Sequence, residues 1–276
     1  MLKIEDLKYI YEDGTVALEN INIDLHKGNK IGVIGSNGSG KSTLFLNMVG
    51  ILQPKQGKVI FNNEGLKYNK KFLRKFRQNI GIVFQDPDKQ IFYSNVYDDV
   101  AFALRNLGYS EEIVRQRVYM ALKKTGAYEF RNKPVHFLSY GQKKRVAIAG
   151  VLAMKSDIIL FDEPTAGLDP VMTESVIDII NTLSRENKKI VISSHNMNLI
   201  YEMCDYVYVL NKGRIIGEGK VEEIFTKENI LKEAGLNEPW LVKLHKNLQI
   251  PLFKDEKCLY DYWRENYEHI SSRSKS

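Results

Sequence analysis

Short apolar runs separated by polar turns fill the first part of the chain, a pattern typical of β-strands. Three such runs occupy residues 7–11, 21–25 and 31–34, with turn signals at 13–14 and 27–28. We therefore predict antiparallel strands over residues 2–34. Four later runs are short, apolar and rich in β-branched residues, which predicts buried strands. They cover residues 57–61, 80–84, 158–161 and 190–194.

The hydrophobic period changes from strand to helix between about residues 90 and 156. Apolar positions recur at helical spacing from Val96 to Leu107 and again from Ile113 to Leu122. A third helix should begin after Ser139, which is a favourable N-cap residue. We predict a helical subdomain at about residues 89–156, inserted between the two halves of a sheet.

The C-terminal part of the chain returns to strands and then becomes helical. Residues 206–219 predict a β-hairpin and residues 221–225 the start of a helix. The aromatic tail beyond residue 226, which contains Trp240 and Trp263, is predicted to be helical. We therefore expect an α/β main domain over residues 1–226 and a C-terminal helical extension over residues 227–276.

One glycine-rich stretch carries the strongest chemical signal. It follows the apolar run at 30–34, precedes a predicted helix, and matches G-x-x-x-x-G-K-[ST], the phosphate-binding loop. Its glycines allow successive N–H groups to face phosphate oxygens, and the helix N-terminus adds unpaired donors. The sequence predicts a nucleoside triphosphate site, with Lys41 on the β- and γ-phosphates and Ser42 on Mg²⁺. The loop residues are Gly35, Ser36, Asn37, Gly38, Ser39, Gly40, Lys41, Ser42 and Thr43.

Polar side chains follow three of the predicted strands, where α/β folds place ligand-contacting groups. Gln85 follows the strand at 80–84, Asp162 and Glu163 the strand at 158–161, and His195 the strand at 190–194. Since side chains alternate along a strand, one carboxylate can face Mg²⁺ while the other faces a water molecule. A lone histidine can equally be a satisfied core or surface residue, but its place at a strand end favours function.

Two further helix starts are predicted, one of which could contribute to a site. Ser139 and the residues after it, Gly141 and Gln142, form a second possible anion site at a helix N-terminus. Asp169 and Pro170 are typical of an N-cap and a first helical position.

Several features leave more than one interpretation open. Tyr11 could stack on a purine ring or simply pack at a strand end. The basic residues at 67–77 and 143–145 could contact phosphates or nucleic acid, although solvated or ion-paired helix faces are commoner.

Composition narrows the class of protein only modestly. The chain has 276 residues, 43% hydrophobic and 27% charged, and its formal charge of +6 is a small excess of 40 basic over 34 acidic residues. Cys204 and Cys258 lack metal or redox spacing, and two thiols in a chain of this size fit a reducing cytosol without a disulfide. The N-terminus does not fit a signal peptide. The longest apolar stretch, residues 146–154, falls short of the roughly 20 residues that cross a bilayer, so a membrane role would be peripheral.

The order of these motifs resembles the ATP-binding-cassette (ABC) family up to about residue 226. The motifs are the phosphate loop, Gln85, Leu138-Ser139-Tyr140-Gly141-Gln142, Asp162-Glu163 and His195. The resemblance implies a P-loop NTPase (RecA-like) core with an antiparallel β-subdomain, and ATP and Mg²⁺ as ligands. It implies that Tyr11 stacks on adenine, that Asp162 holds Mg²⁺ through water, and that Glu163 polarises the attacking water. Gln85 would sense Mg²⁺ and the water at the hinge to the helical subdomain. His195 would contact the γ-phosphate. In a head-to-tail dimer, Ser139, Gly141, Gln142 and Asp169 would meet the nucleotide of the other chain.

A narrower resemblance comes from residues 84–92, 98–102 and 143–150. These look like the ATPases of energy-coupling-factor importers, most like the cobalt importer (CbiO) type. That similarity implies a peripheral ATPase at the cytoplasmic face of the membrane, working as a homodimer or with a paralogue. Its partners would be a membrane coupling protein, docked near Gln90, Phe92 and Tyr93, and a substrate-binding membrane protein. The C-terminal extension would supply dimer contacts, and nucleic acid would not be a partner.

Tyr140 departs from the commonest family signature, which has glycine there, so a partner ATPase with the usual glycine pair could complete the more active site. Three alternatives remain at this stage. They are the ATPase of a shared vitamin-importing module, a soluble ABC ATPase acting on nucleic acid or the ribosome, and a nucleotide switch without turnover.

Overall fold

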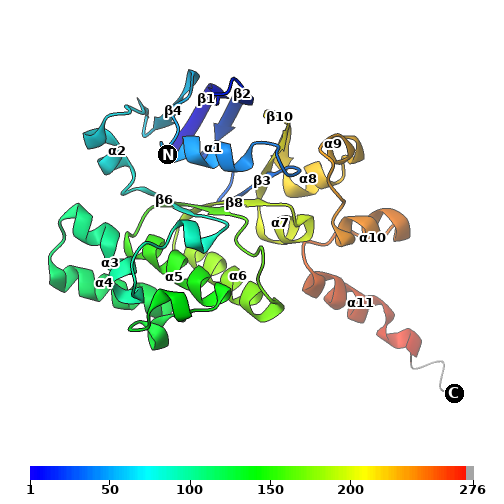
Figure 1. Cartoon of the computed structure of the whole chain (residues 1–276). Helices are drawn as coiled ribbons and strands as arrows, with labels where there is room; N and C mark the ends of the chain where they lie inside the picture. Colours follow the sequence, from blue (N-terminus) through cyan, green and yellow to red (C-terminus); the bar gives the residue numbers. More distant parts are fainter. Residues whose placement is uncertain (272–276) are drawn as a thin grey trace.

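The computed structural model describes residues 1–271; the last residues of the predicted extension, 272–276, lie outside this part. A six-stranded sheet forms the centre of the molecule (Figure 1). Its strands are β3 (Lys30–Ile34), β6 (Ile80–Val83), β7 (Ile158–Asp162), β8 (Lys189–Ser194), β9 (Tyr206–Asn211) and β10 (Arg214–Lys220). Their order is β10-β9-β3-β8-β7-β6, and only β10 runs antiparallel to its neighbour. The carboxyl ends of the parallel strands therefore meet at one edge.

A second, antiparallel sheet covers the N-terminal side of the fold. It contains β1 (Leu2–Ile10), β2 (Val16–Asp24), β4 (Gln56–Phe61) and the short β5 (Glu64–Gly65), in the order β2-β1-β4-β5. The prediction of antiparallel strands over residues 2–34 is confirmed for β1 and β2 and wrong for residues 31–34. Those residues lie in β3, which pairs in parallel with β8 and β9. Burial distinguishes the two kinds of strand. Residues 31–34 are all buried, as in a central parallel strand, whereas buried and more exposed residues alternate along β2.

Three helices lie together between β6 and β7 in the sequence. They are α3 (Val96–Leu107), α4 (Glu111–Lys124) and α5 (Tyr140–Ala153). Each begins after a suitable cap, and at α5 the Ser139 side chain and Gln142 form a complete capping box. Their apolar faces share a hydrophobic core of their own, which includes Val100, Val118 and Val146. The group lies on the side of the central sheet away from the antiparallel sheet (Figure 1).

The remaining helices pack around the central sheet or extend from it. They are α1 (Lys41–Met48), α2 (Lys70–Phe76), α6 (Pro170–Arg185), α7 (Met197–Met203), α8 (Val221–Phe225), α9 (Glu228–Glu233), α10 (Trp240–Leu248) and α11 (Glu256–Ser271). The predicted cap and first residue of α6, Asp169 and Pro170, are confirmed.

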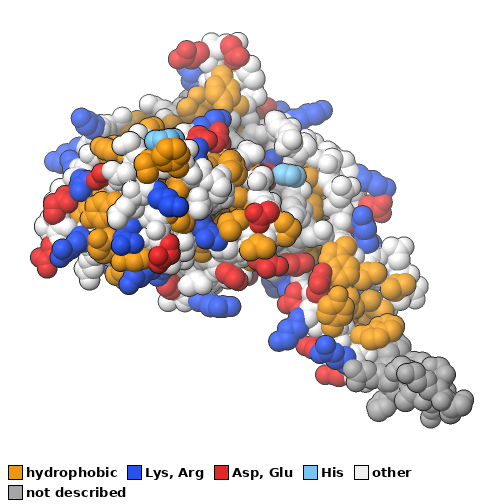
Figure 2. Space-filling view, turned by 60° about the horizontal axis from the view of Figure 1, so that its bottom comes forward, with side chains coloured by type: hydrophobic (Ala, Val, Ile, Leu, Met, Phe, Trp, Pro, Cys, Tyr) orange, Lys and Arg blue, Asp and Glu red, His pale blue; other side chains and the backbone are white. Residues whose placement is uncertain are grey.

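The part of the chain after residue 226 contributes to the same core as the sheet. Leu231, Leu241 and Val242 belong to one buried cluster with Ile192 and Val209. The helix α11 then leaves the body of the protein as a projecting arm (Figure 1). Hydrophobic side chains gather on this arm (Figure 2), where Tyr260 and Trp263 are more than half exposed. Within residues 1–271, no helix has both the length and the apolar character that crossing a bilayer requires.

Candidate active site

The glycine-rich loop turns from β3 into α1 at the carboxyl edge of the central sheet. Gly40 caps α1 in the left-handed conformation (φ +108°) and offers no side-chain cap, so the N–H groups of the first turn remain available to a ligand. Gly38 also has a positive φ of +78°. The hydroxyl of Ser39 is buried without a hydrogen-bond partner. Open amide donors of this kind, at a helix N-terminus, are suited to phosphate oxygens.

Lys41 folds back over this loop. Its Nζ donates to the carbonyls of Gly35 (2.8 Å) and Ser36 (3.1 Å), and the residue is 7% exposed. Burial lowers the pKa of Lys41, while the carboxylates of Glu163 and Asp162 act in the opposite direction. The ammonium is therefore a buried cation whose direct acceptors are two neutral carbonyls, an arrangement that favours an anionic ligand.

Two carboxylates and a histidine follow the neighbouring strands. Asp162 is buried at the end of β7 and accepts a short hydrogen bond from the Ser193 hydroxyl. Glu163, the next residue, is buried and has a φ of +44°, which is strained for a residue with a Cβ. Its amide donates to the carbonyl and hydroxyl of Ser193, both at 3.1 Å. Its Oε2 lies 2.9 Å from Nδ1 of His195, whose side chain is 63% exposed.

These groups surround one cavity of about 710 Å³. Its lining includes Gln85, Asp162, Glu163, His195, Tyr11 and the loop residues Asn37, Gly38, Gly40, Lys41, Ser42 and Thr43. The ends of three neighbouring strands and the phosphate loop thus face one cavity. Gly35, Ser36 and Ser39 do not line the cavity. Tyr11 is 40% exposed, and its hydroxyl lies 2.8 Å from Oγ1 of Thr43.

The sequence did not identify the residues that two hairpin turns contribute to this cavity. Thr15 comes from the β1–β2 turn and Val16 and Ala17 from the start of β2, while Lys212 and Gly213 form the β9–β10 turn. The amide of Gly213 donates to the carbonyl of Ser39 (2.9 Å), and its carbonyl accepts from the amide of Glu19 (2.8 Å). The turns were predictable, but their meeting depends on how the two sheets pack.

The other predicted site residues lie elsewhere in the chain. Ser139, Gly141, Gln142 and Asp169 do not line the cavity. The Ser139 hydroxyl caps α5 through the Gln142 amide (3.3 Å), and the Asp169 side chain caps α6 through the Met172 amide (2.8 Å). The starts of α5 and α6 are thus not part of the cavity that the phosphate loop lines within one molecule.

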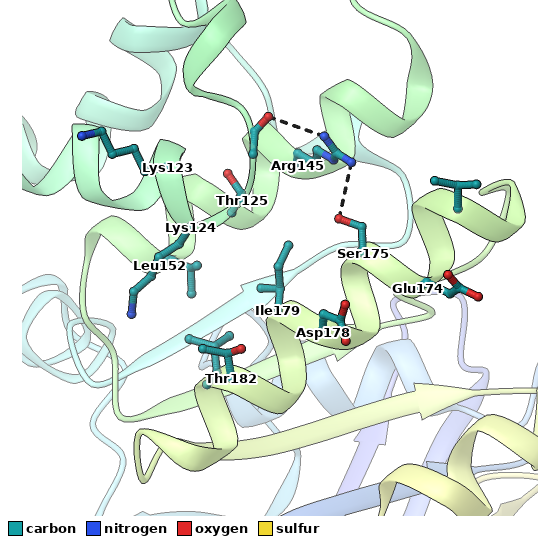
Figure 3. Close-up of a pocket in the computed structure, with 13 residues that line it drawn as sticks. Lys123, Lys124, Thr125, Arg145, Leu152, Glu174, Ser175, Asp178, Ile179 and Thr182 are labelled. Atoms are coloured by element: carbon teal, nitrogen blue, oxygen red, sulfur yellow. Dashed lines mark hydrogen bonds between the residues drawn. The ribbon is translucent and has the colours of Figure 1, made fainter. Parts of the chain in front are cut away.

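The basic run at 143–145 has protein partners. Lys143 pairs with Asp88 (2.7 Å), and Lys144 is fully buried against backbone carbonyls. The guanidinium of Arg145 reaches the Ser175 hydroxyl and the Gly126 carbonyl at the rim of a separate cavity of about 510 Å³ between α4, α5 and α6 (Figure 3). None of the predicted site residues lines that second cavity.

The packing of Gly35 leads to a prediction on stability. A Cβ at this position would lie 2.2 Å from the carbonyl oxygen of Leu210 and 2.5 Å from the Ser39 hydroxyl, so Gly35→Ala must displace backbone. We expect its melting temperature to fall by several degrees or more. Gly150→Ala, in α5, meets nothing within 4 Å and should instead stabilise the protein by about 0.5–1 kcal/mol. Calorimetry of both variants checks the contrast, and an unchanged melting temperature for Gly35→Ala would contradict it.

Comparison with known proteins decides the family. The model of the family described as "ABC transporter" matches residues 18–166. The chain belongs to this family. It is 55% identical to a putative ABC transporter ATP-binding protein of Listeria monocytogenes, aligning 93% of this chain with 96% of the relative. It is 46% identical to the cobalt import ATP-binding protein CbiO of Salmonella paratyphi A (93% and 94%). It is 44% identical to the energy-coupling factor transporter ATP-binding protein EcfA2 of Clostridium perfringens (87% and 84%).

Solved structures of ABC proteins share the fold. The cbiO1 protein of Clostridium perfringens, described as part of the ABC transporter complex cbiONQ, matches with a TM-score of 0.74 and 42% identity, covering 90% of this chain and 95% of that one. A dimeric, post-hydrolysis structure of the ATP-binding cassette MJ0796, bound to ADP and Pi, matches with a TM-score of 0.73 and 30% identity (80% and 99%). As an ABC ATPase, the chain binds and hydrolyses ATP. Its open loop amides and buried Lys41 fit this ligand.

Proposed function

We propose that this chain is the ATP-hydrolysing subunit of an energy-coupling-factor importer for cobalt, or for the related nickel ion. One observation carries the proposal. The chain aligns over nearly its whole length with a cobalt import ATPase at 46% identity, and its loop, carboxylates and histidine surround a single cavity. We place it as a peripheral subunit at the cytoplasmic face of the membrane.

We propose a role for each site residue. The amides of residues 35–43, at the N-terminus of α1, would hold the phosphates of ATP, with Lys41 on the β- and γ-phosphates and Tyr11 against adenine. Ser42, Gln85 and Asp162 would hold Mg²⁺, which when bound neutralises charge on the phosphate oxygens. Glu163 would orient and polarise the attacking water. His195, which contacts the Glu163 carboxylate, would also reach the γ-phosphate.

The second group of site residues supports a working dimer. Ser139, Gly141, Gln142 and Asp169 are placed at helix starts away from the cavity. We propose that they meet the nucleotide held by a second ATPase chain, and that ATP closes this dimer. The extension over residues 227–276 would add dimer contacts through its projecting helix (Figure 1), on which Trp263 is exposed. The dimeric cassette with 30% identity supports this arrangement.

An exposed aromatic surface supports docking of a membrane coupling protein. Phe92 is 77% exposed and Tyr93 44% exposed, beside a groove of about 270 Å³ that Gln90, Phe102 and Ile51 help to line. The half-buried carboxylate of Asp99 accepts from the amides of Phe92 (2.8 Å) and Tyr93 (3.1 Å) and so fixes their backbone. Exposed aromatic side chains on a fixed backbone are typical of an interaction site.

A second candidate is the ATPase of a shared module that serves several vitamin importers. The 44% identity with EcfA2 supports it, and a paralogous ATPase partner would compensate for Tyr140.

The chains that accompany this protein in the membrane distinguish the two candidates. We expect affinity purification from detergent-solubilised native membranes to recover this ATPase with a coupling protein and a metal-binding membrane protein. A second, distinct ATPase in equal amount would favour the vitamin module. Absence of any membrane partner would overturn the transport proposal. Several-fold stimulation of ATP hydrolysis by DNA or RNA would instead favour a soluble ATPase acting on nucleic acid.

A further inference from the structure

The segment that carries Gln85 is tied to α5 rather than to the central sheet alone. The Nζ of Lys144 donates to the carbonyls of Phe84 (2.9 Å) and Gln85 (2.8 Å). The hydroxyl of Tyr140 donates to the same Gln85 carbonyl at 3.0 Å. Further along the segment, the Gln90 side chain joins the Phe84 amide (3.0 Å) to the Ala147 carbonyl of α5 (2.9 Å). These hydrogen bonds connect the backbone of residues 84–90 directly to this helix.

Lys144 is unusual because a lysine is rarely fully buried. It is 0% exposed, and no carboxylate of the described residues lies within ion-pairing distance of its ammonium group. A buried cation needs hydrogen-bond acceptors, since leaving it without them costs free energy. Its two acceptors are the carbonyls of the two successive peptide groups that flank the Gln85 Cα, so the burial of Lys144 holds both in place.

Tyr140 contacts a second loop of the site. A Cβ built on Gly167 would lie 3.3 Å from Cε1 of the Tyr140 ring, so the ring packs against this turn. The turn joins Glu163 to Asp169, the N-cap of α6. One side chain at the first position of α5 thus touches both the Gln85 segment and the loop that follows Glu163. A glycine at this position, as in the commonest signature, could make neither contact.

We propose that Tyr140 and Lys144 are positioning residues that fix the Gln85 segment to the Ser139 end of α5. The Gln85 side chain then reaches the nucleotide only when the signature helix is correctly placed. This inference rests on the role of Gln85 proposed above. In this proposal Tyr140 positions the Gln85 segment through its hydroxyl, a contact that the usual glycine could not make. The residue is then more than a weakened form of the signature.

A double-mutant comparison of ATP hydrolysis by the purified full-length protein tests the inference. Tyr140→Phe removes one hydroxyl and keeps the ring, and the Gln85 carbonyl that it contacts survives in Gln85→Ala. We expect Tyr140→Phe to lower kcat by roughly two- to tenfold with KM for ATP unchanged. In the Gln85→Ala background the same change should have no further effect, because the side chain being positioned is already gone. Lys144→Met should show the same dependence on Gln85.

The matched control is Tyr208→Phe. The Tyr208 hydroxyl also donates to a backbone carbonyl, that of Asp24 (3.1 Å), but does not contact the Gln85 segment. Tyr208→Phe should therefore leave kcat unchanged. A loss from Tyr140→Phe that is equal in both backgrounds would overturn the positioning role while leaving the function of Gln85 intact. An unaltered kcat in Gln85→Ala alone would overturn the proposed role of Gln85 together with this inference.

Discussion

Glu163→Gln is expected to bind ATP and to lose nearly all turnover. The change keeps the size of the side chain and an oxygen that can accept from His195, 2.9 Å away in the native protein, but removes the negative charge that would polarise water. Loss of a positioned general base typically lowers kcat by about 10²–10⁴-fold. Because ATP would be bound and not consumed, the variant should also accumulate as a closed dimer in the presence of ATP. Phosphate release and size-exclusion chromatography with ATP measure the two effects.

The control for this variant is Glu186→Gln. Glu186 is an exposed carboxylate paired with Lys124 and lies outside the cavity, so its neutralisation should leave kcat unchanged. Turnover of Glu163→Gln close to the native value would reject the role of Glu163 in polarising water. Loss of nucleotide binding along with turnover would show instead that the carboxylate matters for assembling the site. The strained backbone of Glu163 (φ +44°) makes the neutral isostere preferable to alanine as a probe.

The residues that the sequence located correctly are those whose position follows from local rules. The loop at 35–43 turns from β3 into α1, Asp162 ends β7, and Glu163 and His195 directly follow strands. Parallel strands place their carboxyl ends at one edge, so predicting the strands was enough to bring these side chains together. The caps Ser139 and Asp169 were likewise predictable from residue type alone.

What the sequence missed depends on contacts between segments far apart in the chain. The sheet to which residues 31–34 belong is decided by their pairing with β8 and β9, more than 150 residues later. Lys144 lies in a basic run that is typical of a solvated surface, yet it is fully buried, and its ammonium donates hydrogen bonds to the Phe84 and Gln85 carbonyls. No local pattern indicates such acceptors, which come from a segment about 60 positions away.

Lys41→Met is expected to weaken ATP binding by roughly 30-fold to a few thousandfold while leaving the fold intact. Methionine has nearly the length of lysine and keeps the apolar stem in place, but it removes the cation that would pair with the phosphates. Removing one partner of a buried, hydrogen-bonded charge pair costs about 2–5 kcal/mol of binding free energy, and each ~1.4 kcal/mol weakens affinity tenfold. Titration of a fluorescent ATP analogue gives the affinity, and the melting temperature reports the fold.

The melting temperature should change little because of the surroundings of Lys41 without nucleotide. The ammonium is buried and its direct acceptors are the Gly35 and Ser36 carbonyls, so the cost of burying a cation offsets much of what its hydrogen bonds contribute. Lys232→Met, which removes an exposed lysine paired with Glu228 on α9, is the control and should alter neither property. Native affinity in Lys41→Met would reject the phosphate-binding role. A large fall in the melting temperature would mean that the hydrogen bonds from Lys41 to the Gly35 and Ser36 carbonyls stabilise the loop itself. The same ammonium group would then both stabilise the loop and bind the phosphates.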